Sequence, residues 1–351
     1  MAKSLDSLLA GRYRDILLQP DQESQYLSSA SEAEVFEAGW AASKRQIMRD
    51  GALDSYLKER VNLLAEEPQF RAIFISNVSK DNTDKLQISR TTLLLLSDRF
   101  RICSKFAGMI QMQMCPSREL EYDTKTNKIS RIQYLYSAID REFTSTPTAS
   151  VTVERFLECQ RSIAWTSRDM HTGSTTMVVL RCPAQTQKQL VDAFSEVEHR
   201  RHLLRYPMII HACFAEDIFV RSMEFSREIA APMYGWETGL RRFNTSNEYT
   251  EHAQRFMRMG RQMGNVNIDY DIYLVSLKFL EEIFDLIKNA DPPASVKAED
   301  WKLLHQEFGG GNLREVYENI NLLRTYGHLY QQRGVIGNNE GSLPEESSKR
   351  I

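Results

Sequence analysis

Residues 161–181 read RSIAWTSRDMHTGSTTMVVLR and hold the clearest fold signal in the chain. Before the turn, Ile163 and Trp165 recur with the two-residue period of a half-buried strand. The stretch Asp169 to Gly173 supplies the residues that tight turns favour, and an apolar run, TTMVVLR, follows it. A connection this short joins antiparallel strands. The sequence therefore predicts a hairpin here and a sheet that is at least partly antiparallel.

Two further segments extend the predicted sheet, and a helix lies between them. Phe70 to Ile75, FRAIFI, is a short apolar run typical of a buried strand. Ile129 to Ile139 alternates apolar and polar residues, which also predicts a strand. The stretch Ile88 to Phe100 contains four consecutive leucines and favours a buried helix. The central region thus predicts a small mixed sheet with helical cover.

The N-terminal region favours helices. Apolar residues recur at three- and four-residue spacing between Leu5 and Leu17. A second helix is predicted from Ser31 to Met48, because Ser31 fits an N-cap and Glu34 completes a capping box. A third is predicted from Asp54 to Glu66, with its apolar residues on one stripe. We therefore expect residues 1–67 to form N-terminal helices.

The C-terminal half also favours helices. From Tyr273 to Ile287 the apolar residues step by four and three, the spacing of a heptad seam, which predicts a long packed helix. A last helix is predicted after Gly311, where Asn312 fits an N-cap and Glu315 follows three residues later. Beyond Gly334 few large apolar residues remain, so a disordered tail is expected.

Together these patterns predict an α/β fold of the α+β type. A small mixed, partly antiparallel sheet would be flanked by helices, and the helix-rich C-terminal half would include a long stalk-like helix. The expected divisions are N-terminal helices (1–67), a sheet-containing core (68–182), a helical layer (183–333) and a disordered tail (334–351).

The composition is that of an ordinary globular protein. The 351 residues include 44 Lys and Arg against 47 Asp and Glu, a formal net charge of −3. Such a balance does not support a nucleic-acid partner, which usually requires a basic surface. No apolar run reaches the roughly 18 residues of a membrane-spanning helix. Five widely spaced cysteines without a secretion signal predict reduced thiols and a cytoplasmic location.

Two pairs of residues have the chemistry of a metal-dependent enzyme. Asp269 and Asp271 resemble the carboxylate pair of some sugar-nucleotide transferases, although acidic residues before a helix also complement its dipole. His199 and His202 are spaced to share one face of a helix, as transition-metal ligands do. Two neighbouring arginines would oppose a cation there, so a solvated charged face is the alternative.

The segment 161–180 resembles a hairpin in the cytosolic part of fungal CorA-like proteins, in which a turn of the Asp-x-x-x-Gly type leads into a Thr-rich return strand. The surrounding order is similar: the strand Arg71 to Ile75 precedes the leucine-rich helix Ile88 to Phe100, and a helical half follows. The resemblance implies a cytosolic domain that feeds a long helix toward a membrane pore. The family's Gly-Met-Asn pore signature has no match, since Met263-Gly264-Asn265 is ordered differently.

We therefore expect a soluble CorA-like regulatory or interaction module with no pore of its own and no enzymatic activity. A divalent cation such as Mg²⁺ would be sensed by the acidic side chains of the long helix, namely Glu281, Glu282 and Asp285. The alternatives are a metal-dependent enzyme that uses one of the two pairs above, and a scaffold. In the last case the chain would form a homo-oligomer through its long helix.

Overall fold

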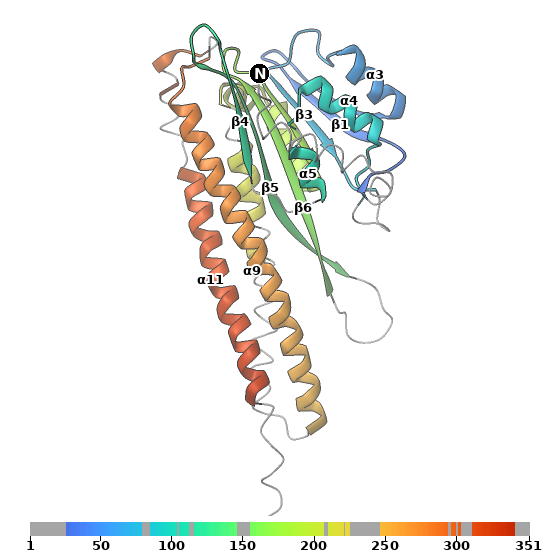
Figure 1. Ribbon diagram of the computed structural model, residues 1–351, viewed down its shortest axis with the longest axis vertical. Coiled ribbons are helices and arrows are strands. Elements are labelled where there is room, and N and C mark those ends of the chain that lie inside the picture. Colours follow the sequence, from blue (N-terminus) through green and yellow to red (C-terminus); the bar gives the residue numbers. More distant parts are fainter. Residues whose placement is uncertain are drawn as a thin grey trace, which may run out of the picture.

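The computed structural model describes residues 26–78, 85–103, 105–111, 116–145, 155–206, 210–220, 222–224, 246–293, 296–299, 301–302 and 311–340. Figure 1 shows two parts, a twisted sheet with helices on both faces and a long pair of helices. The pair runs along one face of the sheet and continues past the lower end of the strands. The expected α/β fold with a helix-rich C-terminal half and a stalk-like helix is confirmed.

Seven strands of the described chain form one sheet in the order β2-β1-β3-β7-β6-β5-β4. Neighbouring strands pair antiparallel except β3 and β7, which pair parallel. The predicted hairpin is confirmed as β6 and β7, with Trp165 opposite Val178. The bounds are β1 Glu32–Ala38, β2 Ser43–Arg49, β3 Phe70–Ile75, β4 Ser117–Tyr122, β5 Ile129–Ser145, β6 Arg155–Asp169 and β7 Thr175–Leu180.

The helix predicted from Ser31 to Met48 is wrong, because this segment forms the hairpin of β1 and β2. Strand β1 lies between β2 and β3 and is buried on both faces, so it lacks the alternation that marks a strand. The Ser31 hydroxyl contacts Thr92 instead of capping a helix, at 2.9 Å. Long-range strand pairing overrides the local capping pattern here. The helix expected from Leu5 to Leu17 lies outside the described residues.

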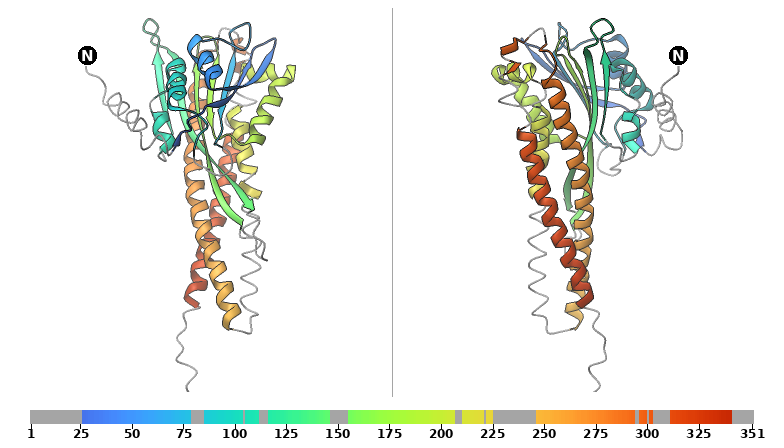
Figure 2. Two further views of the ribbon diagram at one scale, coloured as in Figure 1. Left: turned by 90° about the vertical axis from the view of Figure 1, so that its right-hand side faces the viewer. Right: turned by 60° about the vertical axis from the view of Figure 1, so that its left-hand side comes forward.

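Each face of the sheet has its own apolar core. On one face lie α3 (Asp50–Glu59), α4 (Arg90–Phe100) and α5 (Lys105–Gln111). On the other lie α6 (Ala184–Ser195), α7 (Val197–Arg205), a helix at residues 210–220 and the long helices. Successive residues of β3 point to opposite cores, with Ile73 in the first and Phe74 in the second. Figure 2 shows these two layers from further sides.

The stalk consists of α9 (Ser246–Lys288) and α11 (Gly311–Glu340), which run antiparallel. At about 1.5 Å per residue, the 43 residues of α9 span roughly 65 Å. Both helices are longer than predicted, and α11 passes Gly334, where a disordered tail was expected, to end at Glu340. No helix in the described ranges combines the length and the apolar character needed to cross a lipid bilayer.

Glu37 of β1 holds one end of the first core together. Its buried carboxylate accepts hydrogen bonds from the Tyr56 hydroxyl at 2.8 Å and from Arg71 Nε at 2.9 Å. The backbone N–H groups of Leu63 and Leu64 donate to its other oxygen. These contacts hold the segment after α3 against the sheet, which is why the helix expected to reach Glu66 ends at Glu59. A buried carboxylate satisfied in this way connects β1, α3 and β3.

We predict that Glu37→Gln lowers the free energy of unfolding by about 3 kcal/mol, because it leaves the buried Arg71 guanidinium without its counter-charge. Urea denaturation measures this change. The matched control is Glu32→Gln, which breaks the exposed Glu32–Arg49 pair and should cost less than about 1 kcal/mol. Equal losses in the two variants would contradict the role assigned to Glu37.

Candidate functional site

The outward side of α11 carries three exposed apolar residues, which we call the α11 stripe: Leu322, Tyr326 and Leu329. Their side chains are 52%, 52% and 48% exposed, although they are large and apolar. The steps of four and three place them on one face of the helix. Ile320, which is fully buried against the core, lies two positions from Leu322 and so points about 200° away. Helix α11 therefore has one apolar face turned inward and a second turned to solvent.

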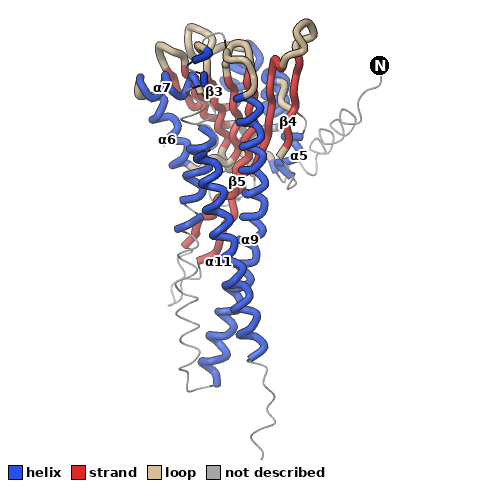
Figure 3. The backbone as a smooth tube through the Cα atoms, turned by 90° about the vertical axis from the view of Figure 1, so that its left-hand side faces the viewer, coloured by secondary structure: helices blue, strands red, loops and turns tan. Residues whose placement is uncertain are grey.

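Helix α9 adds apolar surface at the same level of the stalk. Ile268 and Val275 are 55% and 52% exposed and lie seven residues apart, hence on one face. The Asp271 carboxylate, between them in sequence, accepts a hydrogen bond from Arg324 Nη1 at 2.7 Å. Arg324 lies two residues from both Leu322 and Tyr326, hence on the opposite side of α11 from the stripe. The ion pair therefore sets the two apolar groups at one height of the stalk but on different sides of α11. Figure 3 shows the two helices side by side along this part of the stalk.

The heptad spacing of its exposed apolar residues distinguishes the stalk from the rest of the described surface. Single exposed apolar residues are normal in globular proteins, whereas several at heptad spacing are typical of helix-pairing surfaces. Elsewhere in the described part, the exposed large apolar residues are spread over β2, β4, α7, the segment after α3 and the helix near residue 220; they are Ile47, Val61, Tyr122, Val197, Val220 and Met223. The stalk is therefore the best candidate interaction surface.

The acidic residues predicted to sense a cation lie near the upper end of α9. Glu282 and Asp285 are exposed, and Glu281 is half-buried. The Glu282 carboxylate lies 3.5 Å from Arg118 Nη1 of β4, a cation that competes with any metal. Within the described residues, no three His, Cys, Asp or Glu side chains are grouped so that they could hold a metal ion. Cation binding by these three residues stays a prediction.

The fold places the two pairs proposed for a metal-dependent enzyme in different ways. Asp269 and Asp271 lie within α9, not before it, and residues two apart on a helix do not face each other. Asp269 is buried, whereas Asp271 is exposed and bound to Arg324. His199 and His202 lie exposed on α7, and His199 Nδ1 lies 2.8 Å from the Glu196 carboxylate. The structure therefore separates Asp269 from Asp271, whereas His199 and His202 share one face of α7, as expected. Metal binding by the two histidines stays a prediction.

A buried polar contact that the sequence did not predict joins the helix at residues 210–220 to the sheet. His211 is 2% exposed, with the Tyr134 hydroxyl 2.6 Å from Nε2 and the Tyr136 hydroxyl 2.7 Å from Nδ1. A neutral imidazole donates at one nitrogen and accepts at the other, so both tyrosines are satisfied. Burial lowers the pKa of His211 from 6.5 to about 3. The two-residue spacing of the tyrosines on one face of β5 was the available signal.

We predict that His211 makes the protein less stable in mild acid. Because its pKa is lower in the folded chain, the unfolded chain binds the proton first, so stability is complete above pH 6.5 and declines as the pH falls toward 3. The His211→Gln variant should be less stable than the wild type near neutral pH. Between pH 6.5 and pH 3, its free energy of unfolding should fall by about 1.4 kcal/mol less per pH unit than that of the wild type. Urea denaturation across this range measures the slope. The exposed variant His202→Gln serves as the comparison for loss of a histidine. An unchanged slope in His211→Gln would disprove the assignment.

Several solved structures are similar to this chain in fold. The complete CorA magnesium transporter from Methanocaldococcus jannaschii is similar with a TM-score of 0.43 and 10% identity, over 88% of this chain and 76% of that one. The soluble domain of the same CorA is similar with a TM-score of 0.47 and 10% identity, over 88% of this chain and 95% of that one. The ZntB cytoplasmic domain from Vibrio parahaemolyticus is similar with a TM-score of 0.44 and 7% identity, over 88% of this chain and 99% of that one. No family model matches the chain, and no curated protein matches it.

Proposed function

We propose that the chain is a non-enzymatic, CorA-like interaction module that associates with a second copy of itself through its helical stalk. The observation that supports this function is the α11 stripe, a row of large apolar side chains at heptad spacing on the side of the helix that faces away from the core. Such a row can fit between the corresponding side chains of a second helix.

Burial of the α11 stripe would supply the free energy for association. Full burial of a large apolar side chain contributes about 1.5–3 kcal/mol relative to exposure, so three half-exposed residues on each copy supply several kcal/mol. Ile268 and Val275 of α9 are further exposed apolar side chains at the same height of the stalk. This gain must exceed the loss of translational and rotational freedom on association, which is also several kcal/mol. Because the two terms are of similar size, the balance predicts a weak, reversible oligomer rather than a permanent one.

The surroundings of the stripe resemble the rim of an interface. Thr325 and His328 lie on α11 between the apolar positions and are exposed and polar. The Arg324–Asp271 ion pair fastens α11 to α9, so the stripe cannot turn inward without breaking it. An apolar centre with a polar border is the usual arrangement of protein–protein interfaces.

We predict that the triple variant Leu322→Gln, Tyr326→Gln and Leu329→Gln sediments as a monomer under conditions in which the wild type self-associates. Glutamine is a good helix former, so α11 should persist while its apolar surface is lost. The matched control is Ile47→Gln with Tyr122→Gln, which removes equally exposed apolar residues from the sheet and should leave association unchanged. A wild type that stays monomeric at high micromolar concentration would refute the proposed function.

Divalent-cation sensing is a separate part of the sequence hypothesis. Mg²⁺ prefers several oxygen ligands at short distance, and carboxylates of α9 could supply some of them. Supporting residues are Glu281, Glu282 and Asp285, which lie within two turns of one helix. Their positive neighbour Arg118 would have to leave Glu282 when the ion binds.

If these residues sense Mg²⁺, millimolar MgCl₂ raises the melting temperature, because an ion that binds the native state alone stabilises it by mass action. The variant Glu281→Gln, Glu282→Gln and Asp285→Asn should remove this rise. Glu315→Gln with Glu318→Gln, on the exposed start of α11, should retain it. NaCl at equal ionic strength separates binding from screening. No rise in the wild type would end the cation-sensing hypothesis and leave stalk association untouched.

A further inference from the structure

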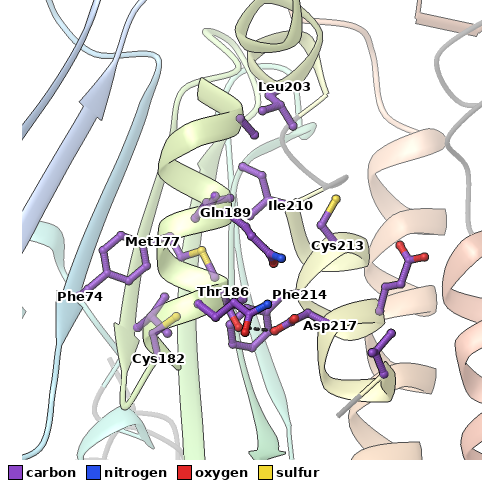
Figure 4. A pocket seen from close by; sticks show the side chains of 16 residues that line it. Phe74, Met177, Cys182, Thr186, Gln189, Leu203, Ile210, Cys213, Phe214 and Asp217 are labelled. Atoms are coloured by element: carbon purple, nitrogen blue, oxygen red, sulfur yellow. Dashed lines mark hydrogen bonds between the residues drawn. The ribbon is translucent and has the colours of Figure 1, made fainter. Parts of the chain in front are cut away.

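A pocket of about 440 Å³ lies between the sheet and the C-terminal helices, away from the stalk surface. Its walls come from β3 and β7 of the sheet, from α6 and α7, and from the helix at residues 210–220. Figure 4 shows side chains of these elements converging on the space between α6 and that helix. Its volume falls in the range of about 300–1,000 Å³ that is usual for small-molecule sites.

The inner part of the pocket is apolar. Phe74, Met177 and Val179 form the sheet side, and all three are at most 2% exposed. Leu203 and Phe214 close it from the helical side, and both belong to the same core as the sheet residues. A ligand that enters here must have an apolar body, because this wall offers it no hydrogen-bonding side chain.

The outer part of the pocket carries negative charge. Glu216 and Asp217 both line it, and the described residues of its lining include no Lys, Arg or His. The Thr186 hydroxyl donates a hydrogen bond to Asp217 Oδ2, which fixes the direction of that carboxylate (Figure 4). The Gln185 and Gln189 amides lie alongside. Two carboxylates beside an apolar cavity attract a cation and repel an anion of the same shape.

The Cys213 thiol also lines the outer part of the pocket, near the negative charge of Glu216. Cys213 lines the pocket, is exposed and carries a free thiol. Burial of its sulfur and the negative charge of Glu216 both raise the pKa of the Cys213 thiol. Cys213 is therefore accessible to a neutral alkylating reagent and is covered when the pocket is filled.

We propose that this pocket binds a small amphiphile with an apolar body and a cationic head. The body would lie against the partly exposed Leu190, Ala193 and Val220, and the head beside Glu216 and Asp217. The proposal goes beyond stalk association and does not depend on it. The rigid contacts of the helix at residues 210–220, through His211 and the sheet, keep the cavity formed in advance of binding. A preformed apolar cavity with a few directed polar groups is the usual form of such sites.

The test uses decyltrimethylammonium and decanoate, two probes with the same ten-carbon chain and opposite charge, below their micelle-forming concentrations. Protection of Cys213 from N-ethylmaleimide, measured by mass spectrometry, reports occupancy of the pocket. Decyltrimethylammonium should protect Cys213 at about tenfold lower concentration than decanoate. Cys103, which packs on the other face of the sheet, should show no protection by either probe.

Two variants make the test specific. Glu216→Gln with Asp217→Asn keeps the shape of both side chains and should abolish the tenfold preference, because the carboxylate charges are gone. Ala193→Phe places a ring in the cavity and should abolish protection by both probes. Glu315→Gln with Glu318→Gln removes two carboxylates elsewhere and should preserve the preference.

Three outcomes would overturn the proposal. Absence of protection in the wild type would show that the pocket binds no such molecule. Equal protection by the two probes would disprove the assignment of a cationic head. A preference that survives Glu216→Gln with Asp217→Asn would place the selecting charge elsewhere. Melting curves of each variant identify any loss of fold independently of binding.

Discussion

The parallel pairing of β3 with β7 is the constraint on which the rest of the structure depends. It joins two antiparallel groups, β2-β1-β3 and β7-β6-β5-β4, into one sheet. Parallel neighbours need a long connection, and the chain between these strands supplies α4 and α5 for one face. Side chains of the two central strands alternate between the faces, so Ile73 and Phe74 enter different cores. Such a sheet is stable only when both faces are covered.

The need to cover the second face explains the form of the C-terminal half. Helices α6, α7 and α9 and the helix at residues 210–220 supply the apolar side chains that the face requires. Helix α9 is much longer than the strands it covers, so its upper part packs on the sheet while its lower part has α11 beside it. The heptad seam from Tyr273 to Ile287 coincides with the part on the sheet. The exposed apolar residues of the stalk are additional to those with which both helices pack against the core.

The sequence predicted those elements whose signal is local. The hairpin of β6 and β7 has alternation and turn residues within one short stretch, and α4 has its four consecutive leucines. Strand β1 was missed because it is buried on both faces, which leaves no regular two-residue period. Strand β2 was missed because it is an exposed edge strand in which only Met48 is buried.

The candidate surface was less predictable for a related reason. The steps of four and three between Leu322 and Leu329 are visible in the sequence, but two apolar stripes on one helix give no sign of which faces the core. Asp269 and Asp271 were paired by proximity in sequence, whereas the helical period sends them to different sides. His211 and its two tyrosines meet only through the tertiary fold.

The helix at residues 210–220 connects the pocket to the base of the stalk. One side of it lines the pocket with Phe214 and Asp217, and His211 binds two tyrosines of β5. The Ala215 carbonyl accepts a hydrogen bond from the Tyr273 hydroxyl of α9 at 2.8 Å. A displacement of this helix on ligand binding would therefore break buried hydrogen bonds, each of which is costly to leave unmade. A ligand that fits the existing cavity avoids that cost, so occupancy of the pocket stabilises the fold without changing the packing of α9. Coupling to the stalk requires a ligand that discriminates between two positions of this helix.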